Sequence, residues 1–550
     1  MNHFPSNVPV LIVGGGPSGL ALANELGWRG VDYLLVDDSD GTTIFPAGEA
    51  IFSRTMEHVR RWGFSRELRH TPGFPDDYPF NIGFFTRVNG HLLKLFEGSN
   101  NAKMPEVNSA ISPEGPMVCP KRIFDPALRD AAQSREVGSI RLRTLCTGAV
   151  QHDEGISVSV VDMASGKIHE VEAMYLADCE GARGTFRKQL NIKYVGSFAE
   201  GQNFAIYFRA PALNRLMLER HGREFFQMHV VNHPNRPYFT VVNRELWRVS
   251  MYVEAGANPD PLKVVMDAIG APMEVEILKS QPWAGHQVVA ERYRDGHIFL
   301  VGDAAHLRWP KGGFGANTGI GDAVDLGWKL AAVFDGWADP ALLDTYELER
   351  RPIGVRNTRE ASNNRQLDKL LKPDPQLDED SAAGAAARQA TGELVAEHRK
   401  REFSTQGVQL GYRYAGSPIV VSDGSPEPAD EPGTYQPSTW PGMRAPHAWL
   451  DDGRSTLDLF GRGFVLLCFR SDAASSRMCD AFAHAHVPLQ VVELDSQAIR
   501  TLYERDFVLV RPDGHVAWRA NAVPEQCAFI AQTVRGARLT QEAGMGTVPA

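Results

Sequence analysis

The N-terminal part of the chain opens with an apolar run that ends in glycines. Residues 8–13 predict a buried parallel strand, because a strand covered on both faces is apolar throughout. Gly19 to Gly27 predicts the start of a helix, and Tyr33 to Val36 predicts a second strand that ends at Asp37. This order predicts a βαβ unit at the beginning of the chain.

The pattern then changes several times along the chain. Residues 74–116 are irregular and rich in aromatic side chains, and residues 202–289 read as aromatic-rich strands. Residues 296–303 predict a further buried strand. A glycine-rich loop follows this strand, and Ile320 to Asp335 then predicts a long amphipathic helix.

A separate unit is predicted at the C-terminal end. Residues 422–434 are rich in Pro, Asp, Glu and Gly and predict a linker. Beyond it, Phe507 to Val510 and His515 to Trp518 flank a Pro-Asp-Gly turn at Pro512 to Gly514, which predicts a hairpin.

Composition limits the partners. The 550 residues include 57 basic and 67 acidic side chains, and the net charge of −10 argues against a nucleic-acid-binding surface. No run of about 18 apolar residues occurs, so no membrane-spanning helix is predicted. The six cysteines include no Cys-x-x-Cys pair and no metal site is expected, while Met1 to Pro9 carries no basic cluster. We therefore expect a cytoplasmic protein with free thiols.

The first glycine cluster fits a dinucleotide fingerprint. Gly14, Gly16 and Gly19 match G-x-G-x-x-G directly after a predicted strand and before a predicted helix. The first glycine permits a tight turn, the second lets the backbone approach a pyrophosphate, and the third lets helix and strand pack closely. Asp37 can accept hydrogen bonds from the ribose of an adenosine. The fingerprint by itself leaves NAD and FAD as alternatives.

A second glycine-rich site lies far along the chain. Gly302-Asp303 ends a predicted strand, and Asp303 can accept a hydrogen bond from a polyol hydroxyl. Pro310 to Gly319 opens a helix whose N-terminus favours negative charge on a ring held against it, such as the pyrimidine edge of a reduced flavin.

These motifs resemble those of the class A flavoprotein aromatic hydroxylases, the para-hydroxybenzoate hydroxylase and phenol hydroxylase superfamily. A third motif, Glu180 to Arg187, resembles the family's Asp-Gly motif, although the family usually has Asp at Glu180. Two further departures are Ala47, where the family often has Arg or Lys, and Lys121, where it often has Gln. The tail from Gly442 to Arg519 resembles the thioredoxin-like third domain of the phenol hydroxylase branch.

The resemblance implies an α/β fold with three units. A Rossmann-like FAD-binding domain is interleaved with a β-sheet substrate domain and followed by a thioredoxin-like domain. The expected ranges are 1–73, 117–200 and 284–400 for the FAD domain, 74–116 and 201–283 for the substrate sheet, 401–434 for a connector and 435–550 for the tail.

The resemblance also implies the chemistry. NADPH or NADH reduces FAD, oxygen forms a C4a-hydroperoxyflavin, and this species hydroxylates a phenolic or other aromatic substrate. The alternatives are epoxidation or Baeyer–Villiger oxygenation of a polyketide-like substrate, or a flavin-binding protein without turnover. Because the tail lacks a Cys-x-x-Cys pair, a structural or homodimer-supporting role is expected for it.

The candidate residues fall into three groups, each with a plainer structural interpretation. The catalytic candidates are Glu49, His306 and Pro310, of which His306 has the alternative of packing under the flavin loop. The cofactor candidates are Gly14, Gly16, Pro17, Ser18, Gly19, Asp37, Arg54, Lys121, Glu180, Arg187, Asp303, Gly313, Gly315, Ala316 and Asn317. The substrate candidates, most easily explained as core residues, are Tyr207, His229, Tyr252 and Trp309.

Overall fold

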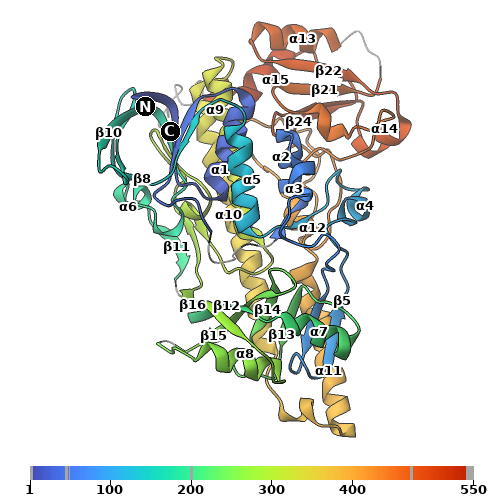
Figure 1. Ribbon diagram of the computed structural model, residues 1–550. Coiled ribbons are helices and arrows are strands. Elements are labelled where there is room, and N and C mark those ends of the chain that lie inside the picture. The colour runs from blue at the N-terminus through green and yellow to red at the C-terminus, as the bar shows by residue number, and fades with distance from the viewer. Residues whose placement is uncertain are drawn as a thin grey trace, which may run out of the picture.

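The computed structural model describes residues 4–43, 48, 50–198, 202–254, 256–470 and 475–539. Figure 1 shows a bundle of long helices beside one sheet, a second sheet at the bottom of the view and the C-terminal unit at the upper right. This mixed α/β architecture is the predicted fold class.

A largely parallel sheet forms the first unit. Its strands in spatial order are β18 (Arg294–Asp295), β19 (Ile298–Leu300), β10 (Ile168–Asp178), β1 (Asn7–Val13), β2 (Tyr33–Val36) and β7 (Ser139–Arg141). β1 pairs in parallel with both β2 and β10, and β10 pairs in parallel with β19. The βαβ prediction is confirmed, and β10 and β19 add strands from distant parts of the chain.

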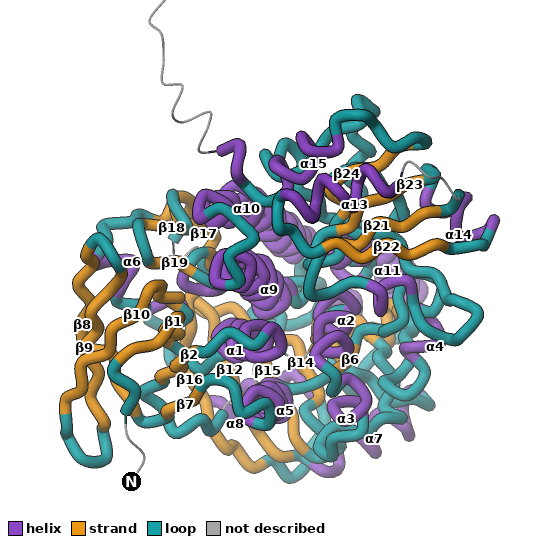
Figure 2. The backbone as a smooth tube through the Cα atoms, turned by 90° about the horizontal axis from the view of Figure 1, so that it is seen from above, coloured by secondary structure: helices purple, strands orange, loops and turns teal. Residues whose placement is uncertain are grey.

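Helices cover one face of this sheet. Figure 2 shows α1 (Pro17–Arg29) between α5 (Lys121–Gln133) and α9 (Phe314–Phe334), beside β1 and β2. The antiparallel strands β8 (Thr144–His152) and β9 (Gly155–Asp162) continue from β10. Their apolar residues form a separate core with Leu11, Leu34 and Leu176.

The helix α9 differs from its prediction in two respects. It begins at Phe314 rather than Ile320, because Gly313 takes φ +74° and α9 starts directly after it. It is also buried on every face from Thr318 to Ala332 rather than amphipathic, because it lies between α1, α10 (Thr345–Leu367) and the C-terminal unit.

The second unit is an antiparallel sheet with one parallel pair. Its strands in spatial order are β16 (Glu276–Ala284), β12 (Gln202–Arg209), β15 (Leu246–Val253), β14 (Tyr238–Val241), β13 (Gln227–Val230), β4 (Ile82–Phe85) and β5 (Leu92–Phe96). Alternate residues Phe204, Ile206 and Phe208 of β12 enter the main core. The opposite face of the sheet therefore carries the polar-tipped residues of β14 and β15, such as Tyr252.

Shorter elements connect these sheets. The helices are α2 (Ser53–Trp62), α3 (Ser65–Arg69), α4 (Met104–Asn108), α6 (Phe186–Gln189), α7 (Pro211–His221), α8 (Pro261–Ile269), α11 (Ala382–Phe403) and α12 (Gln406–Leu410). The strands are β3 (Ala50–Ile51), β6 (Met117–Val118), β11 (Tyr194–Ser197), β17 (Gln287–Ala290) and β20 (His306–Leu307).

The C-terminal unit has a four-stranded sheet in the order β22 (Leu489–Glu493), β21 (Phe464–Cys468), β23 (Phe507–Val510) and β24 (Val516–Ala520). Its helices are α13 (Ser475–His484), α14 (Gln497–Tyr503) and α15 (Cys527–Val534). β23 and β24 are antiparallel, which confirms the predicted hairpin. One apolar cluster joins this unit to the first, because Trp328 and Trp337 pack with Leu466 and Ala517.

Candidate active site

The glycine turn between β1 and α1 is closed on one side and open on the other. Gly14 has φ +111°, and a Cβ on it would overlap the carbonyl of Cys179. A Cβ on Gly19 would likewise overlap the carbonyl oxygen of Gly14. At Gly16, in contrast, a Cβ would meet no described atom within 4 Å. The open side lies where α1, beginning at Pro17, presents its free N–H groups, so the turn fits a pyrophosphate.

Three motifs that are far apart in the sequence meet beside this turn. A Cβ on either Gly302 or Gly319 would overlap the hydroxyl of Ser18. A Cβ on Gly181 would lie 3.9 Å from the Cβ of Asp303, which is exposed. The structure therefore places the first glycine turn, the Glu180 motif and the Asp303 motif around one site.

Asp37 lies at the end of β2, beside the open turn. One carboxylate oxygen accepts the Gly15 N–H at 2.5 Å, and the other accepts the Ser39 N–H at 2.9 Å and the Ser39 hydroxyl. An ionised carboxylate has about four acceptor positions. Asp37 therefore keeps acceptor capacity for a ribose hydroxyl.

Glu180 and Arg187 shape the turn after β10. The Thr185 N–H donates to Glu180 at 2.6 Å, and Arg187 donates to the Ile192 carbonyl at 2.7 Å. Arg187 also lies over the ring of Tyr194, with 3.9 Å between its guanidinium carbon and the ring centroid. The hydroxyl of Tyr194 donates to the Asp303 carbonyl at 3.1 Å. In these contacts both residues support the loops near Asp303.

Asp178 is a buried carboxyl that sequence reasoning missed. Its side chain is fully buried, and burial raises its pKa to about 7, with the negative charge of Glu180 adding to the increase. One oxygen accepts the Glu180 N–H at 3.0 Å, and the other has no hydrogen-bond partner among the described residues. The only sequence signal was an Asp that follows the apolar residues 173–177 at the end of a strand.

The loop from Pro310 to Asn317 leads into α9. Pro310 and Gly313 are exposed, and a Cβ on Gly315 would meet no described atom within 4 Å. Ala316 follows on the first turn of α9. The amide of Asn317 holds the neighbouring chain, because its oxygen accepts the Phe52 N–H at 2.8 Å. The exposed Gly313, the open space at Gly315 and the helix N-terminus fit a flat ring placed against this loop.

Arg54 and Lys121 make their contacts with protein groups. Arg54 is buried, pairs with Glu57 at 2.9 Å and donates to the Asp513 carbonyl at 2.6 Å. Lys121 pairs with Asp125 at 3.2 Å. The contacts of Arg54 lead toward the C-terminal unit rather than toward the glycine turn. Glu49, the remaining acidic candidate, lies outside the described residues, as does Ala47.

His306 is fully buried, and both ring nitrogens have partners. Nε2 lies 2.6 Å from Asp322, and Nδ1 contacts the guanidinium of Arg308. Burial, with the neighbouring Arg308, lowers the pKa of His306 below its usual value. These contacts favour the packing interpretation of His306 over that of a base.

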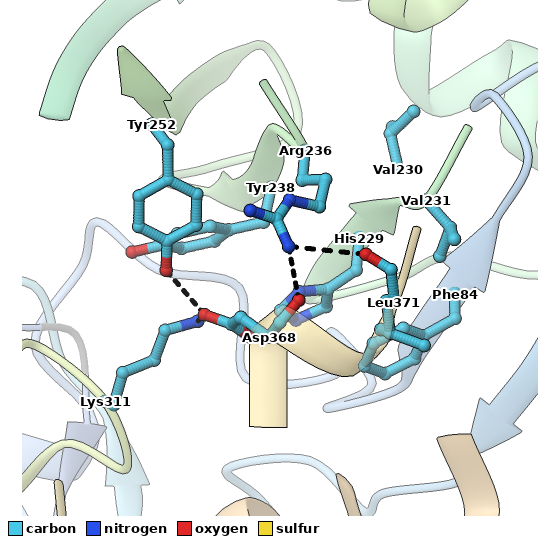
Figure 3. Close-up of a pocket in the computed structure, with 10 residues that line it drawn as sticks. All are labelled: Phe84, His229, Val230, Val231, Arg236, Tyr238, Tyr252, Lys311, Asp368 and Leu371. Atoms are coloured by element: carbon cyan, nitrogen blue, oxygen red, sulfur yellow. Dashed lines mark hydrogen bonds and ion pairs between the residues drawn. The ribbon is translucent and has the colours of Figure 1, made fainter. Parts of the chain in front are cut away.

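Two substrate candidates share one pocket, drawn in Figure 3. The lining residues are Phe84, His229, Val230, Val231, Arg236, Tyr238, Tyr252, Lys311, Asp368 and Leu371. They come from β4, β13, β14, β15 and the β13–β14 connection of the second sheet, from the loop before α9 and from the segment that follows α10. A single loop thus contributes Lys311 to this pocket and the exposed Gly313 to the surface that the sequence predicts to face a flavin.

Asp368 is the buried anion of this pocket. Lys311 lies 3.0 Å from it, the Tyr252 hydroxyl donates to it at 2.5 Å, and Arg399 forms an ion pair with it. Burial alone would raise the pKa of Asp368, but Lys311 and Arg399 hold it well below its usual range. Sequence reasoning missed both Lys311 and Asp368. The signal that could have identified Lys311 was its positive charge within a glycine-rich loop.

His229 offers an unused polar atom to the pocket. It is 8 % exposed, and its ring stacks on Phe84 with 4.4 Å between centroids. Burial, with the charges of Arg399 and Lys311, lowers its pKa well below its usual value, so the ring is neutral at pH 7. Its Nε2 has no hydrogen-bond partner among the described residues.

The other two substrate candidates lie outside this lining. Trp309 is buried, and the guanidinium of Arg365 lies between the rings of Trp309 and Tyr252, at 4.8 and 3.9 Å from their centroids. Tyr207 is opposite Arg248 in the β12–β15 register and is half-buried. Trp309 thus borders the pocket through Arg365, whereas Tyr207 does not line it.

Comparisons with known proteins agree with this geometry. A family model described as an FAD binding domain matches residues 7–361, and one described as aromatic-ring hydroxylase, C-terminal, matches residues 438–537. The chain is 32 % identical to tetracenomycin A2 monooxygenase-dioxygenase of Streptomyces glaucescens, covering 95 % of each chain.

Two solved structures are similar over nearly the whole length. The rebeccamycin biosynthetic enzyme RebC with reduced flavin has a TM-score of 0.90 and 38 % identity, covering 97 % of this chain and 100 % of that one. A ternary complex of aklavinone-11 hydroxylase with FAD and aklavinone has a TM-score of 0.81 and 27 % identity, covering 97 % of this chain and 99 % of that one.

The helices that the structure describes include none with both the length and the apolar character needed to cross a membrane.

Proposed function

Because the chain belongs to the FAD-binding aromatic-ring hydroxylases, we propose that it is an FAD-dependent monooxygenase that uses NAD(P)H and oxygen to hydroxylate a phenolic or other aromatic substrate. One observation carries the proposal: the loop from Pro310 to Asn317 lies between the meeting point of the flavin motifs and an aromatic pocket. The same loop would therefore border both the flavin and the ring that receives the activated oxygen.

Different residues would bind different parts of FAD. The turn from Gly14 to Gly19 would hold the pyrophosphate, Asp37 the ribose and Asp303 the ribityl chain. The N-terminus of α9 would face the flavin ring. When bound and reduced, FAD supplies the electrons that activate oxygen. The protein supplies orientation and a site from which water is excluded.

The substrate would bind between the polar sheet face and the loop. His229 is neutral and offers Nε2 to a substrate hydroxyl or carbonyl group. The ammonium of Lys311 would stabilise a phenolate, which is the activated form of a phenol ring. Its pKa stays above its usual value despite burial, because Asp368 and Glu402 lie beside it. Lys311 is therefore a permanent cation at neutral pH.

The remaining assignments concern the setting of the reaction. We propose a nicotinamide reductant that binds transiently across the flavin face, since the described residues contain one dinucleotide-type sheet. A cytoplasmic location and a homodimer complete the proposal.

Oxygen insertion at another position of a polyketide-like substrate is a second candidate. It is favoured by the similarity to an enzyme named as a monooxygenase-dioxygenase. Products formed under ¹⁸O-labelled oxygen separate the two, because hydroxylation adds one labelled hydroxyl to the ring, whereas epoxidation or Baeyer–Villiger chemistry adds a labelled epoxide or ester oxygen.

The experiment that tests the proposal is a screen of substituted phenols and polycyclic aromatic compounds. The purified yellow protein is expected to oxidise NAD(P)H faster when a substrate is present, with matched oxygen uptake and a hydroxylated product. A protein that never retains FAD would exclude the proposed function. A flavoprotein that no aromatic compound stimulates would favour the non-catalytic alternative.

A further inference from the structure

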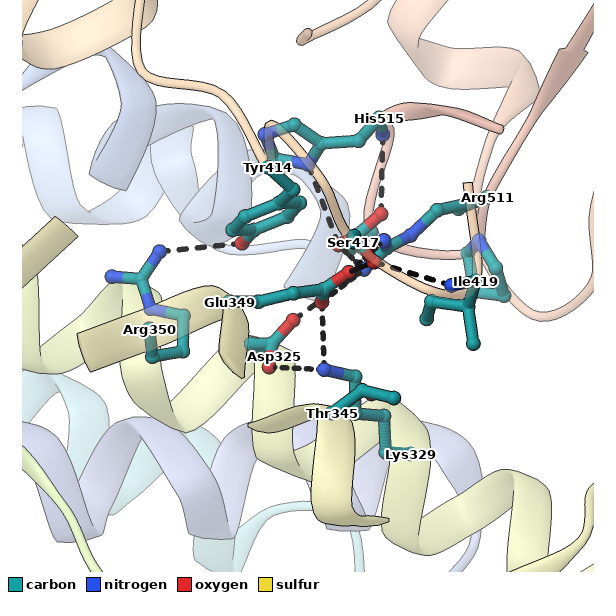
Figure 4. A network of polar contacts seen from close by, with 12 residues as sticks. Asp325, Lys329, Thr345, Glu349, Arg350, Tyr414, Ser417, Ile419, Arg511 and His515 are labelled. Atoms are coloured by element: carbon teal, nitrogen blue, oxygen red, sulfur yellow. Dashed lines mark hydrogen bonds and ion pairs between the residues drawn. The ribbon is translucent and has the colours of Figure 1, made fainter. Parts of the chain in front are cut away.

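The turn of the C-terminal hairpin is buried inside the molecule. Hairpin turns ordinarily lie in solvent. Here Arg511, Asp513 and His515 are each at most 2 % exposed, and the turn lies against α2, α9 and α10. Figure 4 shows the ion pairs that surround it. A turn held in this way connects the C-terminal unit to the helices that carry the flavin motifs.

The first connection runs through two consecutive residues of α10. Glu349 accepts two hydrogen bonds from the guanidinium of Arg511, at 2.5 and 2.9 Å. The next residue, Arg350, donates to Asp322 at 2.8 Å and to the Thr318 carbonyl at 3.1 Å. Adjacent side chains of one helix thus hold the C-terminal unit and the first turns of α9.

Asp322 extends this connection to the predicted ribityl motif. Its carboxylate accepts the Gly302 N–H at 3.3 Å, directly before Asp303. The same carboxylate also holds His306. A shift of Arg350 would therefore move the backbone from which Asp303 projects.

The second connection runs through two consecutive residues of α2. Arg54 donates to the Asp513 carbonyl at 2.6 Å. The next residue, Thr55, donates its hydroxyl to the amide oxygen of Asn317 at 2.7 Å. The arrangement on α10 is therefore repeated on a separate helix that supports the loop before α9.

The charges around the turn make it sensitive to small changes. Arg511 and Lys329 are fully buried among Asp325, Glu349 and Asp513. Lys329 lies 2.7 Å from both Asp325 and Glu349. Removing one cation would leave three buried carboxylates with one positive charge fewer beside them, so the helices would have to move or admit water.

We propose that the turn Arg511–Gly514 is a positioning element of the flavin site, through which the C-terminal unit sets the loop before α9 and the Gly302–Asp303 turn. Arg511 is its central positioning residue and does not itself touch the cofactor. The inference rests on the proposed flavin site. It assigns the C-terminal unit a part in cofactor binding beyond holding the chain together.

The test compares FAD binding by apoprotein variants at a temperature where each is folded. Arg511→Met is expected to raise the FAD dissociation constant at least tenfold and to change the visible circular dichroism of bound flavin. Arg511→Lys should restore part of both. Glu349→Gln keeps the shape of the contact and should raise the constant several-fold, which provides a test if Arg511→Met does not fold.

Arg60→Met is the matched control. Arg60 also lies on α2 and pairs with Asp458 of the C-terminal unit at 2.8 Å, but near the surface. Arg60→Met should leave the FAD dissociation constant within twofold of the wild-type value. Folded Arg511→Met and Glu349→Gln proteins with wild-type constants and flavin spectra, beside a wild type that binds FAD, would overturn this inference alone. A wild type that binds no FAD would overturn the proposed function as well.

Discussion

At the scale of single residues, the glycines of the first turn meet two different requirements, one of the protein's own packing and one of ligand binding. Gly14 and Gly19 are needed by the protein, because a Cβ at either position would overlap backbone atoms. Gly16 is needed only by a ligand, since its φ of −78° suits any residue and the space around it is open. The fingerprint therefore contains both a folding signal and a binding signal.

This distinction predicts opposite effects of one added methyl group. Gly19→Ala should destabilise the apoprotein by about 2 kcal/mol or more, because backbone atoms must move. Gly16→Ala should leave apoprotein stability nearly unchanged and weaken FAD binding at least tenfold. Thermal unfolding and FAD titration measure the two effects. Equal loss of stability in both variants would contradict the interpretation.

Asp178 predicts how stability depends on pH. Its folded pKa of about 7 lies above the ordinary value of 3.8, so the folded state binds the proton more tightly than the unfolded state. Its contribution to the free energy of unfolding is fully present below about pH 4 and is lost as the pH rises toward 7. The loss is of order a few kcal/mol. Asp178→Asn should flatten the dependence of apoprotein melting temperature on pH between 4 and 8. An unchanged dependence of the melting temperature on pH would contradict a raised pKa of Asp178 in the folded protein.

At the scale of elements, the loop before α9 shows what local sequence could predict. Its glycines predicted a site, and the neighbouring strand and helix gave it a place in a fold. The helix began earlier than expected because Gly313 provides a left-handed turn, and no periodicity marks such a start. The pairing of Lys311 with Asp368 could not be predicted, because it depends on how the loop and the end of α10 pack.

Lys311 provides a test at this scale. Lys311→Met should lower kcat/KM for the aromatic substrate by about tenfold or more, since one charge-assisted contact contributes roughly 1.5–3 kcal/mol. FAD binding should change little, and Lys311→Arg should retain part of the activity. Steady-state kinetics and FAD titration measure both. A variant that loses FAD but keeps its kcat/KM when saturated with cofactor would place Lys311 on the flavin side instead.

At the scale of the whole molecule, the C-terminal unit shares an apolar core with the flavin-binding unit. Trp328 of α9 is fully buried and packs with residues of β21 and β24. The hairpin of the tail could be predicted from its own residues, and the resemblance to the family implied the thioredoxin-like fold. Its docking could not, because the buried charges of Arg511 and Glu349 become complementary only in the folded molecule.

This shared core predicts cooperative unfolding. The holoprotein should melt in one calorimetric transition, and a chain that ends near residue 434 should aggregate, because the apolar surface around Trp328 and Trp337 would be exposed. Two well-separated transitions, or a soluble shortened chain with normal FAD binding, would contradict it.

The strand order of the first sheet has a consequence for synthesis. β1 is made first, but its neighbour β10 ends at Asp178 and the adjoining β19 ends at Leu300. At about 5–20 residues per second, roughly 15–60 s pass before these partners have been translated. Until β10 has been translated, one edge of β1 has no native strand to pair with, and the C-terminal end of β10 then lacks its own partner until β19 has been made. The nascent chain is therefore most open to mispairing, and most dependent on chaperones, before the last of these strands leaves the ribosome.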